Sequence, residues 1–227
     1  MKNKIWNTFT YILKFFNSSL RAQFINFKYL AIDRAQYKSL KLGRPVDNKL
    51  EPIPWWTFPA IDFLNQFNFK NEVIFEYGPG NSTFWFIKKE CKKIISIENE
   101  ESWFQELKAT KKNNQELLFR ETKEEYFNTV LDFDFTVLII DGKWRRENLK
   151  FICLNFEKIK NNLKMLIIDN PDKFQLGDLI DEITENFDFV QADFFGFGPA
   201  FRGVGCTTVL LHSREKISKS LNLSPYI

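Results

Sequence analysis

Histidine, cysteine and glycine are scarce in this chain of 227 residues, and each shortage excludes a class of protein. His212 is the single histidine, so mechanisms and metal sites that need two histidines are excluded. Cys91, Cys153 and Cys206 lie far apart and form no Cys-x-x-Cys pair, which argues against a zinc site and a disulfide framework. Nine glycines exclude collagen-like and glycine-rich repeats, and each glycine present is expected at a demanding backbone position. We therefore expect a globular protein of a reducing compartment, with the cytoplasm as the simplest location.

Long apolar runs are missing from the N-terminal segment, although it is rich in aromatic residues. No window of this segment holds eighteen uninterrupted apolar residues, so a transmembrane helix is not expected. Residues 1–46 carry nine Lys or Arg and one acid, a formal charge of +8 against +3 for the whole chain. Their apolar residues recur at helical spacing, as in Ile5, Phe9 and Phe16. We interpret this segment as a basic, aromatic helical arm that either packs on the body or on a partner subunit of a homo-oligomer, or lies peripherally on a membrane.

The remainder of the chain, residues 47–227, has the pattern of one α/β domain. Four of the eight prolines fall between residues 43 and 59 and mark an entry loop. Beyond it, strands are expected at 73–77, 94–98, 117–120, 135–141, 165–169, 187–193 and 206–212, with helices at 81–90, 100–112, 122–131, 144–160 and 172–186. Continuous apolar runs such as 137–140 are typical of parallel strands buried on both faces. The pattern predicts an open, mostly parallel, Rossmann-like sheet with helices on both faces. Because this part of the chain is acidic, nucleic acid is not an expected partner.

Two of the scarce glycines follow the first strand, where an open sheet binds its ligands. Gly78 and Gly80 permit a tight turn, and the helix that begins after them offers amide donors to an anion. Position 83 is threonine, so the third glycine of a dinucleotide fingerprint is missing. Glu98 ends the second strand, twenty-two residues after Glu76, where a carboxylate can accept both hydroxyls of a ribose. The alternative for Glu98 is an ordinary acidic residue at the start of a helix.

Oxygen ligands end the fourth and fifth strands. Asp141 precedes Gly142, and Asp169-Asn170 precedes a proline. Because parallel strands end at the same edge of a sheet, these side chains are expected close together, and such oxygens suit Mg²⁺. The alternative is turn chemistry, since Asp-Gly and Asn-Pro are common breakers. We expect Asp141, Asp169 and Asn170 as the candidate metal ligands.

Taken together, the motifs resemble those of class I S-adenosylmethionine-dependent methyltransferases over roughly residues 53–212. The resemblance rests on Glu76-Tyr77-Gly78-Pro79-Gly80-Asn81-Ser82-Thr83, Ser96-Ile97-Glu98, Ile140-Asp141-Gly142 and Asp169-Asn170, with Pro54-Trp55-Trp56 before them and Gly196-Phe197-Gly198-Pro199 after them. Within this superfamily the chain is similar to bacterial methyltransferases of glycans and small molecules, and to the cation-dependent, catechol-type O-methyltransferases. The resemblance implies a seven-stranded sheet whose last strand is antiparallel.

The resemblance also implies roles for individual residues. S-adenosylmethionine would be held by Glu76, Gly78, Gly80, Ser82, Thr83, Glu98, Glu121 and Asp141, and Mg²⁺ by Asp141, Asp169 and Asn170. The catalytic candidates are Asp141, Lys143 and Arg145. Catechol-type enzymes place a lysine three positions after the first aspartate, where this chain has Trp144 with Lys143 before it. Arg145 and Arg146 are expected to orient an anionic acceptor, although the start of a solvated helix explains one of them equally well.

We therefore predict a cytoplasmic or membrane-peripheral enzyme that transfers a methyl group from S-adenosylmethionine to an oxygen of a small-molecule or glycan-type acceptor, with Mg²⁺ as a possible assistant. Two alternatives stay open: a nicotinamide-dependent oxidoreductase on a similar sheet, and a non-catalytic methyltransferase-like domain tethered to a membrane or partner. The segment 194–205 interleaves four Phe with four Gly and is either a mobile apolar lid or a hairpin loop packed on the sheet.

Overall fold

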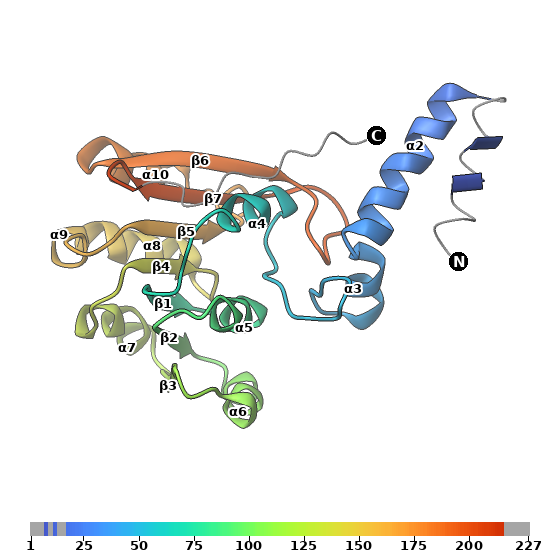
Figure 1. Cartoon of the computed structure of the whole chain (residues 1–227). Coiled ribbons are helices and arrows are strands. Elements are labelled where there is room, and N and C mark those ends of the chain that lie inside the picture. The colour runs from blue at the N-terminus through green and yellow to red at the C-terminus, as the bar shows by residue number, and fades with distance from the viewer. Residues whose placement is uncertain (1–6, 9–10, 13–16, 216–227) are drawn as a thin grey trace.

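The protein is described from a computed structural model of the chain, which covers residues 7–8, 11–12 and 17–215 (Figure 1). Ile5, Phe9 and Phe16, on which part of the predicted arm depends, lie outside the described residues. In the described part the three cysteines are buried and free, and none is paired in a disulfide.

A seven-stranded sheet in the order β3-β2-β1-β4-β5-β7-β6 forms the centre of the molecule. Its strands are β1 (Val73–Tyr77), β2 (Lys93–Glu98), β3 (Gln115–Phe119), β4 (Val137–Ile140), β5 (Met165–Asp169), β6 (Phe189–Gly196) and β7 (Gly205–His212). β1 to β5 pair in parallel, and β7 is antiparallel to both β5 and β6. The predicted sheet and its antiparallel last strand are therefore confirmed.

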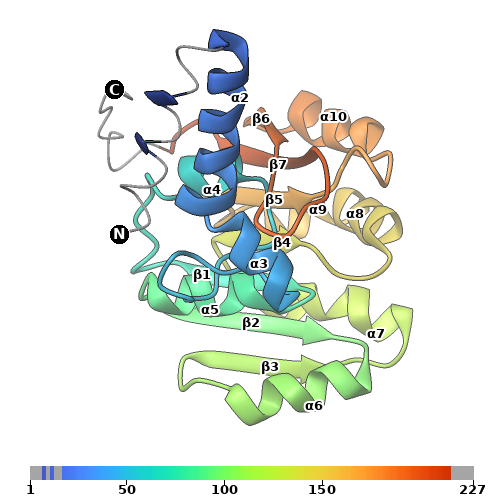
Figure 2. The ribbon, with the colours of Figure 1, turned by 90° about the vertical axis from the view of Figure 1, so that its right-hand side faces the viewer.

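Helices cover both faces of the sheet, and each face has its own core (Figure 2). α4 (Phe58–Leu64) and α5 (Asn81–Lys88) pack on one face around Trp56 and Phe86. α8 (Arg145–Leu154), α9 (Phe156–Ile159) and α10 (Gly177–Asn186) pack on the other face with α7 (Lys123–Asn128) and the 3₁₀ turn Thr129–Asp132. α6 (Glu101–Thr110) lies against β2 and β3. Every residue of β4 and β5 is buried between the two layers, as their continuous apolar runs predict.

The expectation of one helix over residues 144–160 is wrong at Asn155, where the chain leaves the α-helical region and separates α8 from α9. The Asn155 side chain donates to the carbonyl oxygen of Phe151 (3.0 Å) and competes with the helical hydrogen-bond ladder. The apolar period continues across this break, so the sequence pattern alone does not reveal it.

The N-terminal segment has an outer and an inner part. α2 (Ser18–Lys28) projects from the body and buries none of its residues, whereas the π-helical turn Tyr29–Asp33 and α3 (Gln36–Leu42) lead back to it (Figure 1). The side chain of Asn17 caps α2 by accepting from the amide of Leu20 (2.9 Å). Arg34 then forms a bidentate pair with Asp62 of α4 (2.6 and 2.9 Å). The predicted domain boundary after residue 46 stays a prediction, and the contacts of residues 34–46 with the body cross it.

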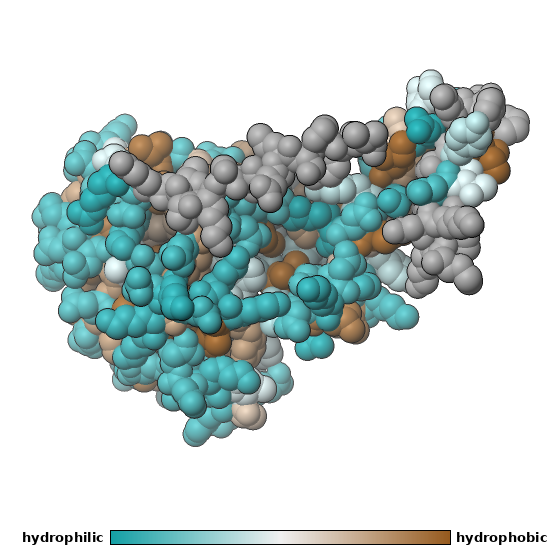
Figure 3. Space-filling model, viewed as in Figure 1, coloured by the Kyte–Doolittle hydropathy of each residue, from teal (hydrophilic) through white to brown (hydrophobic). Residues whose placement is uncertain are grey.

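The helix α2 exposes apolar as well as polar side chains. The body is mostly hydrophilic on the face seen in Figure 3, and α2 exposes the apolar side chains of Leu20, Ile25 and Phe27. None of the helices in the described ranges combines the length and apolar character that a membrane crossing requires.

Candidate functional site

Two adjoining cavities open at the carboxyl ends of β1, β2, β4 and β5. The larger has a volume of about 920 Å³ and the smaller about 570 Å³, and both are lined by Gly78, Pro79, Trp103, Asp141 and Arg145. The smaller cavity continues to Glu98 and Lys143, and the larger continues to Ser82, Asp169, Asn170 and the 201–205 loop. Together they form the cleft that an open α/β sheet offers to a ligand.

The turn after β1 requires its first glycine. Gly78 has φ = 80°, and a Cβ atom there would lie 2.5 Å from the Cα of Gly142, which follows β4. A Cβ on Gly142 would in turn meet the hydroxyl of Tyr126. The two glycines therefore let the β1 and β4 turns touch. Gly80 is extended (φ −175°) with open space around its Cα, so a ligand can approach the backbone there.

Glu76 stabilises the turn after β1 through hydrogen bonds and does not line either cavity. It is fully buried and accepts hydrogen bonds from the hydroxyls of Ser82 and Thr83, the latter at 2.5 Å. Thr83 also accepts from the amide of Gly80 (3.0 Å), so the carboxylate fixes the start of α5. Burial raises the pKa of Glu76 to about 8, because the charged form loses its hydration. Of these predicted cofactor residues, Ser82 reaches the larger cavity, while Glu76 and Thr83 are placed to shape its wall.

Glu98 lies at the end of β2 with one carboxylate oxygen fixed. Its Oε1 accepts from the backbone amides of Asn99 and Glu100, both at 2.7 Å. Among the described residues no donor is recorded for Oε2, and the side chain borders the smaller cavity. Burial raises the pKa of Glu98, and the two amides oppose that shift. The arrangement leaves one oriented oxygen for a ligand hydroxyl.

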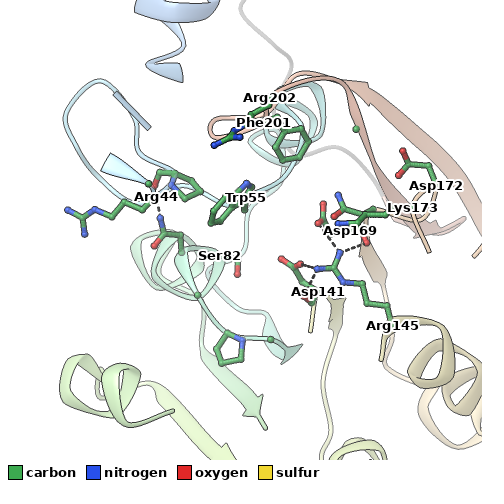
Figure 4. A pocket seen from close by; sticks show the side chains of 18 of the residues that line it. Arg44, Trp55, Ser82, Asp141, Arg145, Asp169, Asp172, Lys173, Phe201 and Arg202 are labelled. Carbon is green, nitrogen blue, oxygen red and sulfur yellow. Dashed lines mark hydrogen bonds and ion pairs between the residues drawn. The ribbon is translucent and has the colours of Figure 1, made fainter. Parts of the chain in front are cut away.

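Asp141 and Asp169 lie at neighbouring strand ends, as predicted, with the guanidinium of Arg145 between them (Figure 4). Arg145 bonds the Asp141 carboxylate at 2.7 Å and the Asp169 carboxylate at 3.0 Å. Trp56 donates its indole N–H to the other oxygen of Asp141 (3.3 Å), and Thr207 donates to Asp169 (3.1 Å). The pKa values of both aspartates are raised, chiefly by burial and, for Asp169, also by the charge of Asp141.

This arrangement does not fit the predicted Mg²⁺ site. The cation that faces both carboxylates is already present as the Arg145 side chain, which leaves no common position for a metal ion between them. Within the described part of the chain, no three His, Cys, Asp or Glu side chains come together as a metal-ligand group. Asn170 lines the larger cavity, but the expectation of a cation bound by Asp141, Asp169 and Asn170 has no support in this geometry.

Three other predicted residues lie away from the aspartate pair. Lys143 is exposed on the smaller cavity, where its ammonium lies 4.8 Å from the centre of the Trp144 ring, so its position gives no support to a role as base. Arg146 points away from the cavities and pairs with Asp178 (2.6 Å). Glu121 is exposed and borders neither cavity, so its predicted role in holding S-adenosylmethionine has no structural support.

Several lining residues escaped prediction. Trp103 is 39% exposed, borders both cavities and donates to the carbonyl oxygen of Pro79 (2.9 Å). Arg44 and Pro45, from the predicted arm, form part of the wall of the larger cavity. Lys173 also lines it. No motif marks these residues, because helices and loops distant in sequence bring them to the site.

The glycine-rich loop after β6 forms another wall of the larger cavity. Its Gly198 and Gly205 both pack on the ring of Phe201, and the amide of Phe58 donates to the carbonyl oxygen of Phe197 (2.7 Å). Gln36 of α3 donates to the carbonyl oxygen of Gly198 (3.1 Å). Of the two alternatives for this loop, the contacts match a loop packed on the body.

Comparison with known proteins identifies the fold. No family model matches the chain, and no curated protein matches its sequence. Among solved structures, the O-methyltransferase TomG from Streptomyces achromogenes, in complex with SAM, is 15% identical with a TM-score of 0.53, over 83% of this chain and 95% of that one. The O-methyltransferase from Bacillus cereus, in complex with SAH, is 11% identical with a TM-score of 0.52, over 82% and 96%. An rRNA methylase from Streptococcus thermophilus is 15% identical with a TM-score of 0.47, over 66% and 92%. The chain has the fold of class I S-adenosylmethionine-dependent methyltransferases, as predicted.

Proposed function

We propose that the protein is an S-adenosylmethionine-dependent methyltransferase that acts on an oxygen of a small-molecule or glycan-type acceptor. The observation that carries the proposal is that the two cavities adjoin: the Gly78–Gly80 turn lines the larger, the oriented Glu98 carboxylate lines the smaller, and Pro79 and Trp103 line both. A cofactor with a nucleoside at one end and an amino-acid group at the other matches these two features, because the nucleoside carries the ribose. Glu98 would accept from the ribose hydroxyls through its free oxygen, and the first backbone amides of α5, including that of Ser82, would meet the carboxylate.

For this reaction the protein has to align the acceptor oxygen with the methyl group and provide a group that accepts the hydroxyl proton. The methyl group of a sulfonium is already activated, so binding the acceptor oxygen in line with it provides most of the catalysis. The oxygen lone pair forms the new bond to the methyl carbon, the carbon–sulfur bond breaks, and its electron pair stays on sulfur. Asp141, which borders both cavities, is the candidate acceptor of the hydroxyl proton, in place of the exposed Lys143.

The larger cavity favours an acceptor with a negative group. Arg44, Lys173 and Arg202 reach its rim from three segments, and the described structure records no salt bridge for any of them (Figure 4). Three acids line the cavity among the described residues, and two of them, Asp141 and Asp169, are paired with Arg145, which leaves Asp172. Trp55, 47% exposed on the same wall, offers a flat apolar surface to a sugar or an aromatic ring. A phosphorylated or carboxylated sugar satisfies both features.

Thermal unfolding with candidate cofactors separates the proposed function from the oxidoreductase alternative. S-adenosylhomocysteine at about 100 times its dissociation constant is expected to stabilise the chain by roughly 2.7 kcal/mol, whereas NADH is expected to give no shift. Stabilisation by NADH alone would assign the site to a nicotinamide cofactor. Stabilisation by S-adenosylhomocysteine without methyl transfer to any acceptor would favour the non-catalytic alternative.

The acceptor class is tested on the complex with S-adenosylhomocysteine. A hexose phosphate is expected to stabilise this complex further, and the same hexose without phosphate is not. The Lys173→Gln/Arg202→Gln variant should lose the phosphate-dependent shift, while Lys150→Gln, which removes an exposed lysine outside the cavities, should keep it. Equal shifts with both hexoses would remove the anionic class, and binding of RNA instead would make nucleic acid the acceptor.

A further inference from the structure

We propose that Arg145 is a resident cation that takes the place of a divalent metal ion between Asp141 and Asp169. The inference concerns the protein without its cofactor and does not depend on the proposed methyl transfer. It predicts that the native site binds no divalent cation, and that removing the guanidinium uncovers a cation site made by the two carboxylates.

The first observation that supports this inference is the hydrogen bonding of Arg145. A guanidinium has five N–H donors, and here it makes five hydrogen bonds. Nε donates to the carbonyl oxygen of Gly142 (3.1 Å). One terminal nitrogen bonds the carbonyl oxygen and carboxylate of Asp141, both at 2.7 Å, and the other bonds the carbonyl oxygen (2.7 Å) and carboxylate (3.0 Å) of Asp169. An oxygen-only shell of carboxylates and carbonyls around one positive centre is also what Mg²⁺ or Mn²⁺ takes.

The surrounding chain fixes Arg145 in this position. Trp144, immediately before it, has φ = 56°, an uncommon conformation for a bulky residue, and turns the chain so that α8 begins at Arg145. The guanidinium lies 4.9 Å from the centre of the Phe174 ring, and 13% of the Arg145 side chain is exposed. Because its contacts join the ends of β4 and β5, a metal ion could enter only if the side chain left this network.

A guanidinium in place of a divalent metal ion changes the net charge of the site. One guanidinium neutralises one of the two carboxylates, whereas a divalent ion would neutralise both. The pair therefore retains one negative charge that can take up a proton.

Mn²⁺ binding, followed by electron paramagnetic resonance, tests the inference directly. Wild type and Arg146→Ala are expected to leave added Mn²⁺ free, since Arg146 pairs with Asp178 outside the cavities. Arg145→Ala should bind one Mn²⁺ per chain roughly tenfold or more tightly than wild type, because it frees the oxygen ligands. Arg145→Ala/Asp169→Asn should lose that site. Arg145→Gln, which keeps some of the hydrogen bonds, is the second variant should the alanine variant fail to fold.

Two results would overturn the inference. One is a stoichiometric Mn²⁺ site in wild type that Asp169→Asn removes. The other is a folded Arg145→Ala or Arg145→Gln protein, judged by its circular dichroism, that gains no Mn²⁺ site. Absence of S-adenosylhomocysteine binding would contradict the proposed function but leave these Mn²⁺ results standing, so the two failures are distinguishable.

Discussion

Gly78 shows how narrowly the residue type is constrained where two turns meet. Gly78→Ala places a side chain at φ = 80° and 2.5 Å from the Cα of Gly142. We expect a loss of roughly 2 kcal/mol or more in the free energy of unfolding, together with loss of S-adenosylhomocysteine binding. Chemical denaturation and calorimetry measure the two effects. Gly177→Ala is the matched control, because a Cβ there meets nothing within 4 Å. Equal effects of both substitutions would show that the contact between the turns is unimportant.

Glu76 gives the stability of the fold a dependence on pH. Its pKa is about 8 in the folded protein against an ordinary value of 4.5, so between these values the folded chain holds a proton that the unfolded chain has released. The stability contributed by Glu76 is complete below pH 4.5 and is lost as the pH rises towards 8. A glutamine does not ionise, so the Glu76→Gln variant does not lose stability at this position as the pH rises. We therefore expect the melting temperature of Glu76→Gln to gain on wild type by several degrees from pH 5 to pH 8. A constant difference between the two proteins across this range would contradict the assignment.

Single residues were predictable from sequence where a strand end determines their place. Glu98, Asp141 and Asp169 follow apolar runs, and parallel pairing brings them to one edge of the sheet. The relation of Arg145 to the two aspartates was not predictable, because it depends on the left-handed Trp144 and the direction of α8. The residue types identified the two aspartates as candidate metal ligands, but the directions of the side chains determine that they face the guanidinium of Arg145.

At the scale of elements, α3 and the loop after β6 support each other although 162 residues separate Gln36 from Gly198. Gln36→Ala removes donors to two loop carbonyls, at 3.1 and 3.4 Å, from a buried position. We expect a destabilisation of about 1–2 kcal/mol. Hydrogen exchange at 198–205 should also become faster. Gln105→Ala, which removes an exposed contact with Glu101, is the control. Unchanged exchange in Gln36→Ala would show that α3 does not hold the loop.

Elements were predictable where periodicity is strong and local. The apolar runs of β4 and β5 and the polar turns after them predicted buried parallel strands. The break at Asn155 and the packing of the 194–205 loop were not predictable, because a side-chain hydrogen bond decides the first and distant contacts such as that of Gln36 decide the second.

At the scale of the whole molecule, the inner part of the N-terminal segment belongs structurally to the site. Ala35, Ser39 and Val46 are buried, and Arg44 and Pro45 line the larger cavity. We therefore expect a chain of residues 47–227 to melt several degrees below one of residues 29–227 and to bind an anionic acceptor more weakly. Thermal unfolding with and without a hexose phosphate measures both effects. Equal behaviour of the two chains would support an arm that ends at residue 46. Membrane contact or homo-oligomerisation through the outer part stays a prediction.

Titration calorimetry of S-adenosylhomocysteine into wild type and Glu98→Gln tests the central claim most directly, because it asks whether the β1 turn and Glu98 form one cofactor site. Wild type is predicted to bind one molecule per chain. Glu98→Gln should bind roughly tenfold or more weakly, since a charge-assisted hydrogen bond to the ribose contributes about 1.5–3 kcal/mol. NADH should give no binding heat with either protein. Failure of wild type to bind S-adenosylhomocysteine, or binding that Glu98→Gln leaves unchanged, would contradict the account.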